Sequence, residues 1–188
     1  KDYQKAKNAE HILTEQIEKG RSELEYIDSV LDTVSRAESE RELAQIREEL
    51  TEQGYLRKQK GKQRPQAALP PLEFTSSDGF KILVGRNNTQ NDKLTLKIAN
   101  KNDMWLHTKD IHGSHTVVFA EGREISDTAI FEAAQLAAYY SKARESSQVP
   151  VDYTLVRYVS KPSGARPGMV IYVNNKTVYV TPKANISE

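Results

Sequence analysis

The sequence predicts an α+β fold, in which a helical coiled-coil arm is followed by a compact mixed α/β domain with a mostly antiparallel sheet. Helical spacing of apolar residues dominates the first 56 positions, whereas strand-like alternation dominates from residue 72 onward. The strands and helices of the second part do not alternate regularly, as they would around a parallel sheet. We therefore expect a helical arm over residues 1–56, a linker over 57–71 and a compact domain over 72–188.

The arm is expected to contain one long helix and one shorter helix. An apolar stripe runs along the first helix, from about residue 8 to residue 34, and consists of Ile17, Leu24, Ile27, Leu31 and Val34. Ser39 followed three residues later by Glu42 is typical of a capping box, so a second helix is expected to begin there. The short polar connection predicts antiparallel packing or a kinked arm, which is either a solvated spacer or a partner-binding surface.

The linker interrupts all periodicity. Residues 57–68 carry five basic side chains and no acidic one, and Pro70-Pro71 closes the segment. Such a run is either solvated or in contact with phosphates.

The compact domain is expected to open with a β-hairpin. Strand-like residues 72–75 and 80–84 flank a turn at Asp78-Gly79. A short helix follows around 94–99, with a polar residue from 88–92 as its cap. Ser126 or Asp127 caps a further helix whose last turn holds Lys142, and residues 153–158, 169–173 and 177–180 read as strands, the last two as a hairpin.

Composition limits the functions to consider. The chain is 37% hydrophobic and 28% charged and has no cysteine, as in a globular protein without disulfides, which is compatible with a reducing cytosol. No apolar run approaches the length of a membrane-spanning helix, and the first residue is Lys1 rather than Met, as in a piece of a longer protein. The net charge of +1 excludes a general nucleic-acid coat, so RNA contact requires a local patch.

Residues suited to RNA contact follow the first hairpin and recur in later loops. A strand end that gives way to a helix start suits a phosphate or an unpaired base, and indole and imidazole rings suit stacking. The predicted RNA-binding residues are Arg86, Asn87, Asn88, Trp105, His107, His115, Lys142, Lys161 and Arg166. The competing interpretation places Trp105 in the core, makes His107 a buried hydrogen-bonded group and makes Arg86 an ion-pair partner.

Patterns for metal binding and catalysis are incomplete. His107, His112 and His115 lie within nine positions, but Gly113-Ser114 disfavours the helix that would direct two imidazoles at one metal. Adjacent Ser114 and His115 point apart in an extended chain, and no GxSxG elbow is present. Residues 164–168, GARPG, lack the Lys-Ser/Thr of a P-loop. We therefore expect no metal, no cofactor and no enzymatic activity.

Several uncommon short motifs of the sequence resemble those of the NFACT family. These are DGF, ILVGRNN, QND and LT within 78–95, D–W–H and GSHTVV within 103–118, AAQLAAYYSKAR at 133–144, VDYT at 151–154 and KPSGARPGMVIY at 161–172. The resemblance covers most of residues 73–182. The first 56 residues resemble only the coiled-coil middle region of the family, as many long amphipathic helices would.

The resemblance implies a ribosome quality-control factor. NFACT proteins bind large ribosomal subunits with obstructed peptidyl-tRNA and recruit tRNA, so that a C-terminal tail, alanine in bacteria, is added without mRNA. The partners implied are the large subunit, its rRNA, and tRNA or peptidyl-tRNA, in the cytoplasm and without a membrane. The fibronectin-binding name of bacterial relatives suggests the alternative, an adhesion or protein-interaction module with an extracellular-matrix partner, although the sequence shows no repeat array.

Overall fold

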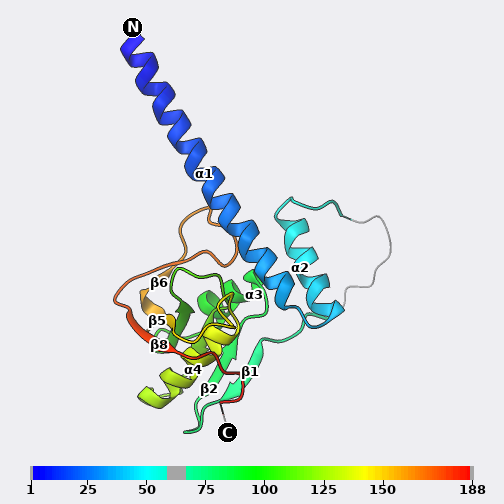
Figure 1. Ribbon diagram of the computed structural model, residues 1–188, viewed down its shortest axis with the longest axis vertical. Helices are drawn as coiled ribbons and strands as arrows, with labels where there is room; N and C mark the ends of the chain where they lie inside the picture. Colours follow the sequence, from blue (N-terminus) through cyan, green and yellow to red (C-terminus); the bar gives the residue numbers. More distant parts are fainter. Residues whose placement is uncertain (1, 59–66, 187–188) are drawn as a thin grey trace.

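A computed structural model describes residues 2–58 and 67–186 and confirms the predicted α+β class (Figure 1). Over this part of the chain, the α-helices are α1 (Asp2–Arg36), α2 (Glu40–Glu52), α3 (Asn88–Lys93) and α4 (Asp127–Tyr139). None of the helices described is long and apolar enough to cross a membrane. Most of the basic linker, residues 59–66, lies outside the described residues.

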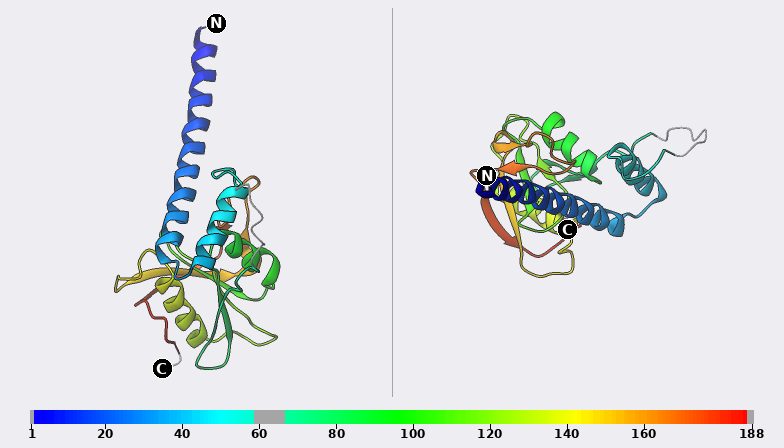
Figure 2. Two further views of the ribbon diagram at one scale, coloured as in Figure 1. Left: turned by 90° about the vertical axis from the view of Figure 1, so that its right-hand side faces the viewer. Right: turned by 90° about the horizontal axis from the view of Figure 1, so that it is seen from above.

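The two arm helices lie side by side and run in opposite directions (Figures 1 and 2). The Ser39 side chain accepts a hydrogen bond from the Glu42 backbone N–H, so the predicted start of the second helix is confirmed. Tyr26, Val30 and Ile46 form a small buried cluster between the helices. Met169 of the compact domain packs against the same cluster, so the base of the arm is docked on the domain.

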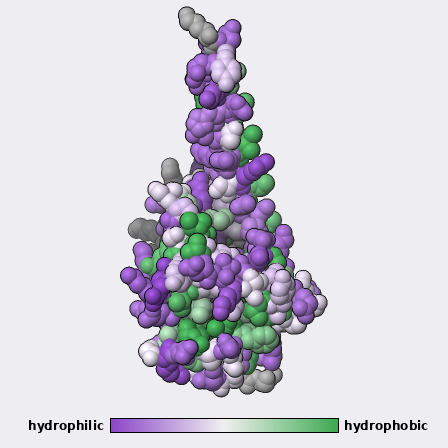
Figure 3. All heavy atoms as spheres, turned by 90° about the vertical axis from the view of Figure 1, so that its left-hand side faces the viewer, coloured by the Kyte–Doolittle hydropathy of each residue, from purple (hydrophilic) through white to green (hydrophobic). Residues whose placement is uncertain are grey.

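The face of α1 that is buried differs from the predicted stripe. Leu24 and Leu31 remain 62% and 65% exposed, whereas Tyr26 is fully buried and Val30 nearly so. Figure 3 shows hydrophobic side chains along one edge of the projecting part of the helix. The stripe therefore does not pack against α2, and no other described helix pairs with it, so a coiled coil is not formed within this part of the chain.

The central sheet is antiparallel throughout, with the order β1-β2-β4-β3-β5-β8. Its strands are β1 (Leu72–Thr75), β2 (Lys81–Val84), β3 (Met104–Thr108), β4 (Thr116–Val118), β5 (Val149–Leu155) and β8 (Lys176–Val180). The first two strands form the predicted hairpin, in which Gly79 has a φ of 88° and provides the left-handed turn position. Strands β6 (Val159–Ser160) and β7 (Ile171–Tyr172) form a separate two-stranded sheet.

The two faces of the sheet carry different coverings because neighbouring residues of a strand point to opposite sides. Ile82, Leu106 and Val118 face the alanine-rich helix α4, which Ser126 caps as predicted. Leu83, Trp105 and Val117 belong to a second cluster on the other face. That face is covered by the π-helix η1 (Leu94–Ile98), the 3-10 helix η2 (Val156–Tyr158) and the β6–β7 hairpin.

Several local predictions are wrong. Residues 156–158 do not continue the expected strand, because β5 ends at Leu155 and these residues form the 3-10 helix η2. Residues 171–172 do not pair with 176–180, because β7 pairs with β6 and β8 pairs with β5. The ring of Tyr172 lies 4.7 Å from that of Trp105, and its hydroxyl donates to Asp152, which holds β7 over the sheet face and out of the sheet. In addition, α4 ends at Tyr139, so Lys142 lies beyond the helix rather than in its last turn.

Candidate nucleic-acid interface

Arg86 lies at the end of β2 and joins the compact domain to the arm. Its Nη1 atom is 2.5 Å from Oε1 of Glu42 in α2, and its Nε donates to the Pro70 carbonyl at 2.7 Å. The arginine and glutamate side chains are only 19% and 14% exposed. Arg86 is therefore an ion-pair partner, as the competing interpretation predicts. Its cation is not free at the surface.

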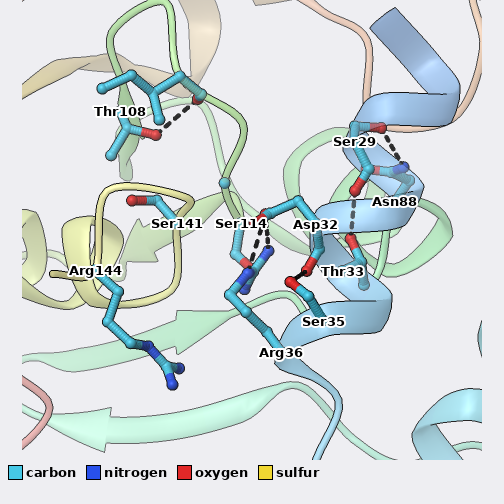
Figure 4. A network of polar contacts seen from close by, with 12 residues as sticks. Ser29, Asp32, Thr33, Ser35, Arg36, Asn88, Thr108, Ser114, Ser141 and Arg144 are labelled. Carbon is cyan, nitrogen blue, oxygen red and sulfur yellow. Dashed lines mark hydrogen bonds and ion pairs between the residues drawn. The ribbon is translucent and has the colours of Figure 1, made fainter. Parts of the chain in front are cut away.

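The two asparagines that follow are buried and structural in position. Asn87 caps α3 by accepting a hydrogen bond from the Gln90 N–H, because its extended backbone directs the side chain at the exposed N–H groups of the helix. Asn88 donates from its side-chain amide to the Ser29 hydroxyl of α1 at 2.9 Å (Figure 4). Both residues are 6% exposed, so neither amide faces solvent for an RNA base.

A second contact at the junction involves Arg36 of α1. Its guanidinium lies 2.9 Å from Oδ2 of Asp32 on the same helix and 3.4 Å from the Ser114 hydroxyl of the domain (Figure 4). The Ser114 hydroxyl therefore faces a guanidinium of the arm.

Lys161 and Arg166 lie in the connection between β6 and β7 and also bind carboxylates. The Lys161 Nζ atom is 2.8 Å from Oδ2 of Asp92 and donates to the Arg166 carbonyl at 2.7 Å. Arg166 reaches the arm, where it binds Glu23 and lies over the Tyr55 ring at 5.1 Å. Three of the predicted RNA-binding residues, Arg86, Lys161 and Arg166, therefore do not form a patch of unpaired positive charge, because each cation faces a carboxylate.

The aromatic candidates form an internal cluster. Trp105 is 1% exposed and stacks on His107 with a ring separation of 5.8 Å, while His115 meets it edge to face at 5.3 Å. The indole of Trp105 is thus enclosed and presents no free face for stacking on a base. Trp105 is therefore a core residue, as the competing interpretation predicts.

His115 uses both ring nitrogens inside the protein. Nε2 lies 3.1 Å from the Gly168 carbonyl, which only accepts, so Nε2 carries the proton and Nδ1 accepts from the Thr95 hydroxyl at 2.8 Å. Burial is the main reason that the pKa of His115 falls to about 3, and burial also lowers the pKa of His107. In the described part of the chain, no three His, Asp or Glu side chains are grouped so as to hold a metal ion.

Lys142 is the one predicted RNA-binding residue that the structure exposes. Its backbone N–H donates to the His112 carbonyl, which fixes the loop after α4 against the loop before β4.

Two further sets of residues were not predicted from the sequence. The first is Glu49, which is 3% exposed and joins α1, α2 and α3; its neighbour Leu50 on the packed face of α2 was the available signal. The second is a set of exposed lysines around η1, namely Lys93 at the end of α3, Lys97 within η1 and Lys101 after it. Their spacing of four residues can be read in the sequence, but it does not reveal that all three are exposed.

The fold, together with the contacts between the arm and the compact domain, defines a class of protein. In this class, an antiparallel α+β domain carries a helical arm that is fixed by buried polar contacts. The chain belongs to the NFACT family. Residues 71–174 match the NFACT protein RNA binding domain, and residues 1–68 match the NFACT N-terminal and middle domains.

Relatives and a solved structure support this membership. The chain is 50% identical over 186 residues to the Rqc2 homolog RqcH of Bacillus subtilis (strain 168) and 45% identical over 183 residues to that of Streptococcus suis (strain 05ZYH33), covering 97% of this chain and 32% and 33% of those proteins. The chain thus spans about a third of the length of the curated relatives it matches. The C-terminal structure of the fibronectin/fibrinogen-binding protein from Streptococcus suis superimposes with a TM-score of 0.92 at 42% identity, over 98% of this chain and 74% of that one.

Proposed function

We propose that this chain is the RNA- and ribosome-binding part of a ribosome quality-control factor. The proposed factor binds obstructed large ribosomal subunits with peptidyl-tRNA in the cytoplasm and recruits tRNA for mRNA-independent addition of a C-terminal alanine tail. The observation that carries the proposal is the match of residues 71–174 to an RNA-binding domain, together with RqcH relatives that are up to 50% identical.

Within that factor, we assign this part of the protein to binding and not to catalysis. The residues that resembled a catalytic pair are engaged elsewhere, because the Ser114 hydroxyl faces Arg36 and both nitrogens of His115 are hydrogen-bonded. The docked base of the arm supports a role in orientation. Ion pairs and a buried carboxylate fix α1 against the domain, so a partner held by the domain would have a defined position relative to the arm.

The exposed stripe of α1 supports a coiled-coil role for the arm. Leu13, Ile17, Leu24, Ile27 and Leu31 are all at least 36% exposed, and positions 13, 17, 20, 24, 27, 31 and 34 alternate in steps of four and three. This spacing is that of the seam of a coiled coil. We therefore propose that the stripe pairs with another helix, which is the partner-binding alternative for the arm.

The second candidate function is adhesion, and it rests on the similarity to the solved structure of the fibronectin/fibrinogen-binding protein from Streptococcus suis. Co-sedimentation with purified large ribosomal subunits, compared with binding to immobilised fibronectin, separates the two candidates. We expect saturable binding to the subunits that weakens steeply with salt. Binding to fibronectin alone, insensitive to salt, would replace the proposed function by adhesion.

A further inference from the structure

We propose that the domain contacts unpaired RNA through an exposed basic surface around η1 and η2. We call it the η1–η2 surface and define it as Lys93 at the end of α3, Lys97 in η1, Lys101 after η1, and Arg157 and Tyr158 in η2. This inference rests on the proposed function and specifies where the RNA lies and in what form.

The lysines of this surface have charges that the protein does not neutralise. Lys93, Lys97 and Lys101 are all exposed, and among residues 2–58 and 67–186 none of them forms an ion pair. Lys161 and Arg166 show the contrast, since both are paired with carboxylates at the junction. Unpaired ammonium groups on a protein surface can neutralise RNA phosphates, and the counterions bound to those phosphates are then released.

The acidic residues that flank these lysines in the sequence are turned inward. Asp92 accepts a hydrogen bond from the Gly168 N–H at 3.0 Å in addition to its ion pair. Asp103 is 2% exposed and accepts from the backbone N–H groups of Asn100 at 2.7 Å and Ala120 at 2.9 Å. Both carboxylates are thus satisfied by inward partners, and residues 93–102 present only positive charge.

Arg157 extends the surface across the chain. Its backbone N–H donates to the Lys101 carbonyl at 3.3 Å, and its guanidinium binds the Asn102 side chain. Segments 56 positions apart are thereby held together on one side of the domain. The segment that contains Arg157 adds no negative charge, because residues 153–187 include five Lys or Arg residues and no Asp or Glu.

Tyr158 follows Arg157 directly in η2 and adds an aromatic side chain to the surface. It is 37% exposed, and its carbonyl accepts from the Val173 N–H at 3.2 Å, which anchors its backbone to the β6–β7 hairpin. An exposed ring on a basic surface suits a single strand, in which bases are free to stack, better than a duplex. Ile171 and Val173 are each 59% exposed on the same hairpin and would suit a protein partner, but the free charges favour RNA.

Matched pairs of charge-removing variants test the surface. In residues 1–188, Lys97→Gln/Lys101→Gln removes two charges from the η1–η2 surface, and Lys109→Gln/Lys176→Gln removes two exposed charges from elsewhere on the domain. With fluorescent oligouridine as probe, we expect the first variant to bind about tenfold more weakly and to flatten the salt slope by about 0.7 per lost contact. The second variant should match the wild type in affinity and slope.

The form of the RNA is tested at the aromatic residue. Tyr158→Leu should weaken oligouridine binding by about 5- to 100-fold, since a stacked base is lost, while Tyr158→Phe should retain it. A hairpin duplex with the same number of phosphates should be bound equally by all three proteins. Unchanged thermal midpoints exclude misfolding as the cause.

The outcomes separate this inference from the proposed function. If the wild type binds oligouridine and both double variants weaken it equally, or neither does, the η1–η2 surface is refuted while the proposed function stands. If the wild type binds neither RNA nor large subunits, the proposed function itself fails. Binding to large subunits that ignores salt but is weakened by Ile171→Ser would assign the surface to a protein and overturn the proposal.

Discussion

The hydroxyl of Tyr26 in α1 donates a hydrogen bond of 2.7 Å to the buried carboxylate of Glu49 in α2. The other carboxylate oxygen accepts from the backbone N–H and the hydroxyl of Thr89, at 3.0 and 3.1 Å, at the start of α3. Burial and the neighbouring carboxylate raise the pKa of Tyr26, so its phenol remains protonated and continues to donate. One side chain therefore joins both arm helices to the compact domain.

Removal of this carboxylate should loosen the whole junction. We expect Glu49→Ala to lower the free energy of unfolding by about 2 to 4 kcal/mol, because the buried hydroxyl of Tyr26 loses its acceptor and Thr89 loses two hydrogen bonds. The exposed neighbour gives the control, and Glu48→Ala should change stability by less than about 0.5 kcal/mol. Urea denaturation of both variants measures the difference, and equal midpoints would show that the carboxylate is dispensable.

The two faces of α1 should respond differently to truncation. Val30 is 6% exposed and packs on Ile46, whereas the adjacent Leu31 is 65% exposed. We expect Val30→Ala to lower the free energy of unfolding by about 1 to 3 kcal/mol and Leu31→Ala to leave it nearly unchanged. Thermal unfolding of the two variants is sufficient for the comparison. A larger loss for Leu31→Ala would mean that the apolar stripe is the packed face after all.

These residues also show how far sequence reasoning reaches. Local signals were sufficient for the caps at Ser39 and Ser126 and for the turn at Gly79, because each depends on neighbours within a few positions. The buried face of α1 was not predictable from spacing, since the most regular apolar stripe is the exposed one.

The candidate site was harder to predict for the same reason. The partner of Arg86 lies 44 positions away, and the partner of Arg166 lies 143 positions away, so neither neutralisation is encoded in the local sequence. The unpaired charges of Lys93, Lys97 and Lys101 could not be predicted for the opposite reason. The nearby carboxylates of Asp92 and Asp103 turn inward, which only the fold reveals. Charge counting cannot distinguish the two cases without the fold.

The Arg86–Glu42 ion pair should be energetically coupled, because both side chains are mostly buried. A double-mutant cycle with alanine at the two positions should give a coupling energy of about 0.5 to 3 kcal/mol. The same cycle on the exposed Lys81–Glu73 pair, at 3.9 Å, should give a value near zero. Additive effects at Arg86 and Glu42 would contradict a structural role for this arginine.

Acid should destabilise the protein through His115. Its folded pKa of about 3 is lower than the ordinary value of 6.5, so below pH 6.5 the unfolded chain takes up a proton that the folded chain does not. The contribution of His115 to the free energy of unfolding is fully present above pH 6.5. As the pH is lowered below this value, it decreases by up to about 1.4 kcal/mol per pH unit. Denaturant unfolding between pH 7 and 5 should therefore show a shallower pH dependence in His115→Gln, which removes the titrating group. Equal slopes for the two proteins would show that His115 titrates alike in both states.

The salt dependence of tRNA binding tests the central claim, that this chain binds RNA through phosphate contacts. The affinity of residues 1–188 for purified tRNA is measured at a series of KCl concentrations, and the logarithm of the association constant is plotted against the logarithm of the salt concentration. We predict a straight line with a negative slope that corresponds to several released counterions. Absence of binding at low salt, or an affinity that does not change with salt, would contradict the account.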